Sequence, residues 1–325
     1  MNHLSIFNFE PAKTHQLSRW HAVVFAAVFV ISFSLLEAVN RHVFVNQKAI
    51  DFKTLNEFLK VTDKVQILFL GDSHFVEGID SEVFDRKVFN LSFNGASFVQ
   101  SYYLLKRYVD SLEALEVVVL PTDLHSFSSM RTRRITEPYF WNRFIDYDEL
   151  RTANGWEGLY RNWFKELTLL DPTFGRKQFV KNLIALATGK AFERSSFSRE
   201  SEQELAINIR RHFEGREAFD SSLLFYFGRL LELCRARGIH VVTLQTPLSR
   251  SHLAQASHYV TSKEVQSQTL KKGIVDKHLD YQNLFLNRDE LFRADGDHLN
   301  EAGARIFSEV LKSDLDRSQI LKGSR

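Results

Sequence analysis

Two short motifs that lie far apart in the chain contain the residue types of a serine nucleophile and its activating partners. They read GDSH at positions 71–74 and DGDH at positions 295–298. A serine hydroxyl is a weak nucleophile until a neighbouring base accepts its proton, and a carboxylate commonly orients that base. We therefore predict acyl transfer through Ser73, with His298 as the base and Asp295 as the carboxylate that holds the imidazole.

The other residues of these motifs have less specific interpretations. We expect His74 to point away from the nucleophile that it follows. Asp297 has the wrong spacing for a triad partner, so we interpret it as a residue at the start of the last helix. Taken alone, the first motif could be a strand-to-helix turn with a capping Ser or Asp. Both motifs together could bind a metal ion, but no Cys or His-x-His pattern supports this. We predict neither a metal site nor a cofactor.

The segments around the motifs alternate between strand and helix patterns. Apolar runs rich in β-branched residues predict strands at 65–70, 88–91, 117–120 and 239–244. Apolar residues at helical spacing predict a helix from Ser97, a helix that Asp220 caps and Gly238 ends, and a last helix capped by Asn300. This alternation implies a parallel sheet with right-handed crossovers, and hence an α/β fold.

Polar residues follow the predicted strands at the ends where parallel sheets bind their ligands. Ser73 follows the first strand, Asn94 and Gly95 follow the second, and Thr122 follows the third. His125 lies slightly further along, where it could contact a substrate or be a solvated loop histidine. We expect these residues to meet at the carboxyl edge of the sheet.

Three stretches of the chain resemble the SGNH/GDSL hydrolase superfamily. They are GDS at 71–73, NLSFNGAS at 90–97 and DGDHLNEAG at 295–303. The resemblance covers residues 65–125 and 220–315. It implies a flavodoxin-like three-layer α/β/α sandwich with a parallel sheet, in which backbone N–H groups following the first two strands stabilise the oxyanion.

On this resemblance, the oxyanion donors are the N–H groups of Ser73 and Gly95. The third block of the superfamily, usually Gly-x-Asn-Asp, is replaced here by PTDLH at 121–125. The asparagine that normally donates to the oxyanion is therefore absent, and one such donor can be worth about 2.7–4 kcal/mol. Asn94, Thr122 or a group from the following insertion could replace it.

That insertion, at about 124–218, differs in composition from the rest of the chain. It is rich in charges and contains Trp141, Trp156 and Trp163. We predict a helical insertion at the mouth of the site. It could be a cap that covers the sheet, a lid or a partner-docking surface, and its aromatic side chains could stack on sugar rings.

Near the N-terminus, residues 20–39 are almost wholly apolar, and about 20 such residues are enough for a helix to cross a bilayer. We predict a transmembrane anchor there, with 1–19 in the cytoplasm, 40–64 as a tether and 65–325 as the catalytic domain. A cleaved signal peptide and a buried core helix are the alternatives. The anchor and the signal peptide both place the domain outside a bacterial cytoplasmic membrane, in the periplasm or outside the cell.

The composition narrows the classes of partner. The chain has 325 residues, of which 44% are hydrophobic and 25% charged, as in globular proteins. A formal net charge of +2 and the lack of a basic block give no reason to expect nucleic acid as a partner. The single cysteine, Cys234, excludes an internal disulfide, and we interpret it as a core residue.

A single N-terminal anchor before such a domain resembles the accessory proteins of polysaccharide O-acetylation and of D-alanyl transfer. The resemblance implies a periplasmic serine acyltransferase that forms an acyl-serine and passes the acyl group to a polysaccharide or cell-envelope glycan. A multispanning membrane acyltransferase would be its possible partner. An esterase that deacylates a glycan or lipid, and a non-catalytic scaffold of a polysaccharide-modification complex, are the alternatives.

Overall fold

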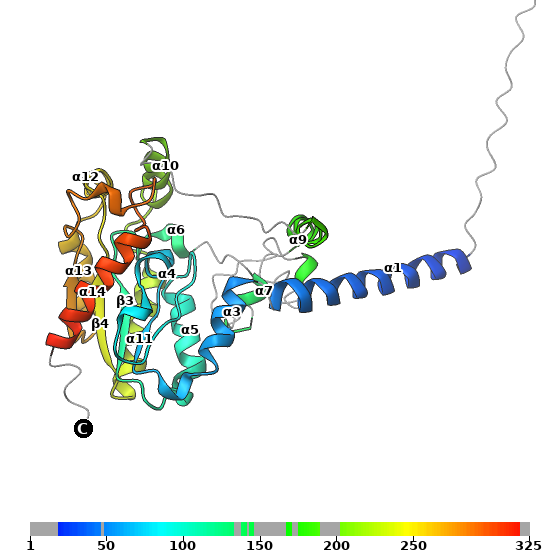
Figure 1. The fold of residues 1–325 in the computed structure, drawn as a ribbon, viewed down its shortest axis with the longest axis horizontal. Helices are drawn as coiled ribbons and strands as arrows, with labels where there is room; N and C mark the ends of the chain where they lie inside the picture. Colours follow the sequence, from blue (N-terminus) through cyan, green and yellow to red (C-terminus); the bar gives the residue numbers. More distant parts are fainter. Residues whose placement is uncertain are drawn as a thin grey trace, which may run out of the picture.

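Five parallel strands form one sheet in the order β2-β1-β3-β4-β5. The computed structural model describes residues 19–46, 49–132, 138–141, 143–145, 167–170, 175–188 and 202–318. The strands are β1 (Ile67–Phe69), β2 (Val88–Asn90), β3 (Val117–Pro121), β4 (His240–Gln245) and β5 (Lys277–Asp280). This order is that of flavodoxin-like folds, so the predicted α/β class is confirmed (Figure 1).

The fifth strand was not among the predicted ones. It pairs with β4 at the edge of the sheet, and its sequence KHLD contains one buried apolar residue, Leu279. An edge strand has only one paired neighbour and needs no continuous apolar run, so this strand has no clear signal in the sequence.

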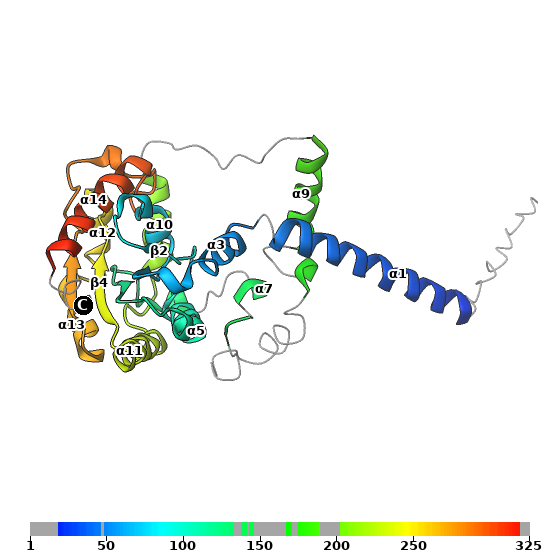
Figure 2. The ribbon, with the colours of Figure 1, turned by 60° about the horizontal axis from the view of Figure 1, so that its bottom comes forward.

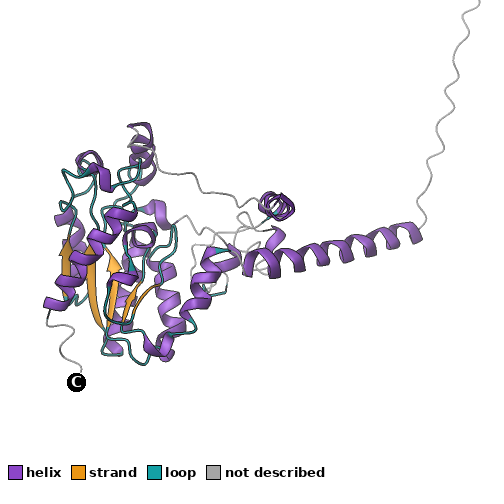
Figure 3. Ribbon diagram, viewed as in Figure 1, coloured by secondary structure: helices purple, strands orange, loops and turns teal. Residues whose placement is uncertain are grey.

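Alternate side chains of the central strands enter two separate cores. Leu68 and Val118 pack on one face against α3 (Ile50–Phe58), α5 (Phe98–Tyr108) and α11 (Ser221–Ala236). On this same side lie α12 (Arg250–Ala256) and α13 (Ser262–Lys272). Figure 3 shows the strands between the two groups of helices. This arrangement is the expected three-layer sandwich.

The opposite face of the sheet is covered by α4 (Ser73–Gly78) and α14 (Glu301–Arg317). Ile67 and Val119 contact Phe75 of α4 and Phe307 of α14 within this second core. Because α4 begins with Ser73, the second core also fixes the helix that carries the expected nucleophile.

The helix caps follow the sequence closely. The Ser97 hydroxyl accepts a hydrogen bond from the Val99 N–H and forms a capping box with Gln100. The Asp220 carboxylate accepts from two N–H groups at the start of α11. Asn300 caps α14 through the N–H of Gly303. The three predicted helix starts are confirmed.

The N-terminal helix α1 (Arg19–Val39) continues directly into a π-helical segment, η1 (Asn40–Val45). Residues 20–45 form one helix long and apolar enough to cross a membrane, and almost none of its most apolar stretch is buried. This exposure is inconsistent with a buried core helix. Figure 2 shows α1 extending away from the sheet and its helices.

The segment 40–64 differs from the polar tether that we predicted. Besides η1 it contains α3, whose Phe52, Leu55 and Phe58 are buried in the first core. The one-turn helix η2 (Thr62–Lys64) then leads into β1. Most of the segment is therefore helical and packed, because its apolar residues recur at helical spacing.

The described parts of the insertion are helical. They are α6 (Ser129–Thr132), α7 (Pro138–Trp141), η5 (Thr168–Leu170), α9 (Arg176–Thr188) and α10 (Glu202–His212). Trp141 is buried against Phe93 and Phe140, so its ring is not available to stack on a sugar as we had expected. Trp156 and Trp163 lie outside the described residues, as does most of the predicted cytoplasmic segment.

Candidate active site

The structure brings Ser73, His298 and Asp295 together at hydrogen-bonding distance. His298 Nε2 lies 2.9 Å from Ser73 Oγ, and His298 Nδ1 lies 2.7 Å from Asp295 Oδ2. A base must lie within about 2.6–3.2 Å of the proton donor that it activates. The three side chains therefore have the geometry of a Ser-His-Asp triad, although Ser73 and His298 are 225 positions apart.

Ser73 is positioned by the turn between β1 and α4. The carboxylate of Asp72 caps α4 by accepting a hydrogen bond of 2.9 Å from the His74 N–H. A Cβ atom at Gly71 would come within 2.8 Å of Phe75 and 3.0 Å of Pro121, so only glycine fits without a shift of its neighbours. This tight turn places Ser73 Oγ at the carboxyl edge of the sheet.

The second motif is also preorganised by its own backbone. Asp295 Oδ1 accepts hydrogen bonds of 3.1 Å from the N–H groups of Asp297 and His298, while Oδ2 accepts from the His298 ring. Gly296 between them has a φ of 64°, a left-handed conformation that glycine adopts at little cost. The DGDH spacing thus holds the acid and the base in one turn.

The pKa shifts of His298 and Asp295 suit acid–base catalysis. Burial alone would lower the pKa of His298, but its hydrogen bond to Asp295 and the charge of Asp297 outweigh that effect and raise the pKa above its usual value. Burial would raise the pKa of Asp295, yet the hydrogen bond from His298 lowers it. Asp295 is therefore ionised and supports the positive charge that His298 gains when it accepts a proton.

A cavity of about 430 Å³ opens beside the triad. Its lining combines the triad with residues of the second block and of the insertion. The lining residues are Ser73, Glu77, Asn94, Gly95, Met130, Arg131, Asn208, Arg211, His212, Arg293, Asp295 and His298. Among these described residues Met130 has the only large apolar side chain. Most of the residues that line the cavity are therefore polar or charged.

Of the expected oxyanion residues, Gly95 and Asn94 line this cavity, and Gly95 has a φ of 74°. Thr122 does not: it is fully buried, and its N–H donates to the carbonyl of Leu244 at 2.8 Å. Thr122 is therefore not the oxyanion donor that we expected. Strand β3 extends one residue further than predicted, and the N–H group of Thr122, which follows it, is used in pairing with β4. Asn208 of α10 brings a buried amide from the insertion to the cavity instead.

His125, which we had considered as a substrate-binding residue, does not line the cavity either. It is buried behind the site, with its ring between those of His74 and His212, at 4.6 Å from each. It also contacts Arg131 of the insertion. Burial and the nearby Arg131 charge lower the pKa of His125 to about 4, so the ring is neutral at ordinary pH.

Arg131 is a site residue that sequence reasoning missed. Its guanidinium forms a buried ion pair with Asp72 and donates to the carbonyl of Ala96 at 2.9 Å, so it joins the turn after β1 to the loop after β2. Burial would raise the pKa of Asp72, but Arg131 holds it well below its usual value. No local pattern predicts this pair, because it joins residues 59 positions apart.

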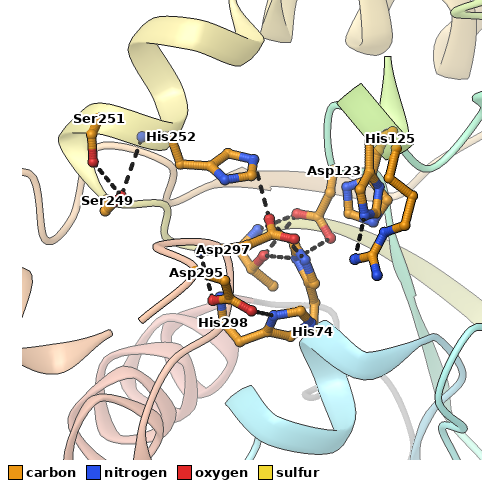
Figure 4. Close-up of polar contacts among 12 residues, drawn as sticks. His74, Asp123, His125, Ser249, Ser251, His252, Asp295, Asp297 and His298 are labelled. Carbon is orange, nitrogen blue, oxygen red and sulfur yellow. Dashed lines mark hydrogen bonds and ion pairs between the residues drawn. The ribbon is translucent and has the colours of Figure 1, made fainter. Parts of the chain in front are cut away.

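Asp297 also differs from our expectation, and it pairs with His74. Both are buried, and His74 Nε2 lies 3.2 Å from Asp297 Oδ1. His252 Nε2 lies 3.2 Å from the same oxygen, so Asp297 sits between two imidazoles (Figure 4). Asp297 is thus part of a buried polar cluster and not simply a residue at the start of the last helix.

The other ring nitrogen of His74 extends this cluster toward β3. His74 Nδ1 is 2.9 Å from the Thr246 hydroxyl, which donates at 2.9 Å to Asp123 Oδ1. Burial alone would lower the pKa of His74, but Asp297 and Asp123 raise it well above its usual value. We conclude that His74 is an imidazolium held between two carboxylates.

Two groups of these side chains have the spacing of metal ligands. They are Asp72 with His74 and His125, and His74 with Asp297 and His298. In the first group the Arg131 guanidinium already contacts both Asp72 and His125, and it would repel a cation. In the second group both ring nitrogens of His298 are already engaged in the triad, Nε2 with Ser73 and Nδ1 with Asp295.

No family model and no curated protein matches the chain. Among solved structures, it is similar to a GDSL-like lipase from Bacteroides thetaiotaomicron, with 10% identity over 83% of this chain and 98% of the other, and a TM-score of 0.40. It is also similar to a lipase from a goat rumen metagenome, with 11% identity over 77% of this chain and 96% of the other, and a TM-score of 0.35.

Proposed function

We propose that the protein is a membrane-anchored serine acyltransferase of the SGNH/GDSL type, which transfers an acyl group to a polar hydroxyl acceptor such as a glycan. The observation that carries this proposal is the hydrogen-bonded series Ser73–His298–Asp295 at the edge of a polar cavity. The membrane location is supported by the exposed apolar helix at residues 20–45.

In the first half of the reaction, Ser73 Oγ attacks the acyl carbonyl of a donor ester while His298 Nε2 accepts the hydroxyl proton. Asp295 stabilises the resulting imidazolium. In this proposal the N–H groups of Ser73 and Gly95 stabilise the oxyanion of the tetrahedral intermediate. When the intermediate collapses, the donor's oxygen leaves with the proton from His298, and the acyl group remains on Ser73.

The second half reverses these steps with a different alcohol. A hydroxyl group of the acceptor gives its proton to His298 Nε2 and attacks the acyl-serine carbonyl. Ser73 Oγ then leaves and recovers the proton. Hydrolysis would follow the same course with water as the attacking group, so the acceptor that the cavity binds decides between transfer and hydrolysis.

The cavity favours a polar acceptor over a lipid ester. Its amide and guanidinium groups, from Asn94, Asn208 and Arg211, are suited to donate hydrogen bonds to sugar hydroxyl or carboxylate oxygens. Pockets for small molecules are typically lined mainly by hydrophobic and aromatic side chains, whereas Met130 is the only large apolar side chain among the described residues of this lining. A multispanning membrane acyltransferase that supplies the acyl group remains part of the proposal, together with a location outside a bacterial cytoplasmic membrane.

The proposal is tested by partitioning of the acyl group. Full-length protein in detergent would be given p-nitrophenyl acetate with and without an added oligosaccharide, and acetylated sugar and free acetate would be measured together. A transferase yields acetylated sugar that depends on Ser73, whereas an esterase yields acetate alone. Ser73→Ala should abolish both products and the exposed Ser111→Ala should change neither. Equal products from the wild type and Ser73→Ala would contradict both the transferase and the esterase, because each requires an acyl group on Ser73.

A further inference from the structure

Helix α9 of the insertion exposes an apolar stripe that no other described part of the chain covers. Val180, Leu183 and Ile184 are 52%, 40% and 53% exposed, and Ala187 is also exposed. These residues lie at positions i, i+3, i+4 and i+7, the spacing of one face of an amphipathic helix. In a soluble setting such a face would be expected to pack on a core.

Another side of α9 holds it against the end of the apolar N-terminal helix. The ring of Phe179 meets that of Phe44 in an edge-to-face contact, with centroids 5.8 Å apart. Leu169 of η5 joins these two in a small core, and Phe33 of α1 packs against it. Phe33 precedes Phe44 by three turns, so this part of the insertion lies alongside the last turns of the apolar helix.

A buried carboxylate makes the attachment specific. Glu37, an acidic residue within the apolar helix, accepts hydrogen bonds from the N–H and hydroxyl of Thr168 at 2.6 and 2.9 Å, and from the N–H of Leu169 at 2.9 Å. Asn40 donates to the same Thr168 hydroxyl at 2.9 Å. These contacts fix η5, and with it α9, at the end of α1.

The axis of α9 runs crosswise to that of α1 (Figure 2). If α1 crosses a bilayer, a helix lying across its end runs along the membrane surface. The sequence of α9 contains Arg176, Lys177 and Lys181 but no acidic residue. Basic residues beside an apolar stripe are typical of helices that lie in the headgroup region of membranes with anionic lipids.

From these observations we propose that α9 is an interfacial membrane helix, with Val180, Leu183, Ile184 and Ala187 inserted into the bilayer surface beside the anchor. The proposal rests on the membrane location given under the proposed function. It gives the insertion a second attachment to the bilayer and limits the rotation of the domain about its single anchor.

The test uses full-length protein reconstituted into vesicles of phosphatidylcholine and phosphatidylglycerol. Single cysteines at Ile184→Cys, Gln178→Cys and Val28→Cys would each carry an environment-sensitive NBD fluorophore. Native Cys234 should remain unlabelled, because it is buried and its burial raises the pKa of the thiol to about 12. Gln178 is exposed on the polar side of α9, and Val28 lies within α1. Circular dichroism would check that each variant is folded.

We expect blue-shifted emission and quenching by nitroxide-labelled lipid at positions 184 and 28, and neither effect at position 178. Loss of the effect at 184 in vesicles without phosphatidylglycerol would show that anionic headgroups contribute to the binding. Quenching at 28 with none at 184 would overturn the interfacial helix and leave the anchor intact. No quenching at 28 would overturn the anchor, and the inference with it, while the acyl-transfer assay would still test the enzyme.

Discussion

His74 and Asp297 form a buried ion pair, with 3.2 Å between Nε2 and Oδ1, directly behind the triad. Each residue is the neighbour in sequence of a triad member, since His74 follows Ser73 and Asp297 precedes His298. The rings of His74 and His298 lie 4.9 Å apart. The nucleophile and the base are thus linked twice: once through their own hydrogen bond and once through the pair that lies behind them.

Asp297→Asn should move the pH dependence of the reaction. The Asp297 carboxylate helps to raise the pKa of His298, and this histidine must be neutral to accept the proton of Ser73. Removing the charge lowers the pKa of His298, so the acid limb of kcat/KM should shift to lower pH. A pH profile of p-nitrophenyl acetate turnover measures this. The exposed Asp289→Asn is the matched control, and an unshifted limb in Asp297→Asn would contradict the account.

We expect Asn208→Ala to lower kcat, because the buried Asn208 side chain lines the cavity and could serve as an oxyanion donor in place of the missing third-block asparagine. Removal of one oxyanion donor typically reduces kcat by about 10²–10³-fold. Thr122→Val is the comparison. The Thr122 hydroxyl is buried, has no hydrogen-bond partner among the described residues and does not line the cavity, so kcat should be unchanged. A lower kcat in Thr122→Val than in Asn208→Ala would contradict the choice of Asn208 over Thr122 as the oxyanion donor.

Acidification should destabilise the fold through His125. Its folded-state pKa of about 4 lies below the ordinary value of 6.5, so the unfolded chain binds the proton first as the pH falls. The contribution of His125 to stability is therefore complete above pH 6.5 and is lost progressively between pH 6.5 and 4. It amounts to roughly 3 kcal/mol by linkage.

The measurement is denaturant unfolding of the wild type and His125→Gln at several pH values between 7 and 4. His74, whose pKa is raised, contributes to stability with the opposite pH dependence. Because both proteins contain His74, the difference between them reports on His125. We expect His125→Gln to lose less stability than the wild type over this range. Parallel curves would show that the His125 ring is not kept neutral by burial.

Two glycines should respond oppositely to alanine. A Cβ atom at Gly303 would lie 2.3 Å from the carbonyl oxygen of Leu291, whereas at Gly228 of α11 the nearest atom is 3.8 Å away. Gly303→Ala must shift the loop before His298 and should cost about 1–3 kcal/mol of unfolding free energy. Gly228→Ala should instead stabilise the helix by about 0.5–1 kcal/mol. Thermal unfolding of both variants measures the contrast, and destabilisation by Gly228→Ala would contradict it.

The sequence predicted what local patterns encode. The GDSH turn, the DGDH turn and the helix caps each depend on residues close together in the chain, and three of the four predicted strands, β1, β3 and β4, are largely buried apolar runs. The edge strand β5 lacks such a run. The ion pair of Arg131 with Asp72 depends on a tertiary contact that no local pattern encodes. The buried cluster around Asp297 did have a signal in the sequence. Asp297 and His74 are titratable residues that stand next to triad members in the chain and have no role in the triad itself.

The central claim is that Ser73 carries the acyl group, and mass spectrometry of the intact protein after brief exposure to p-nitrophenyl acetate tests it most directly. The account predicts one acetyl group on the peptide that contains Ser73, absent in Ser73→Ala and strongly reduced in His298→Gln. In Asp295→Asn the rate of acetylation should fall by about 10⁴-fold, as for other triads that lose the orienting carboxylate. Acetylation of Ser73→Ala at the wild-type rate, or turnover that does not depend on His298, would contradict the account.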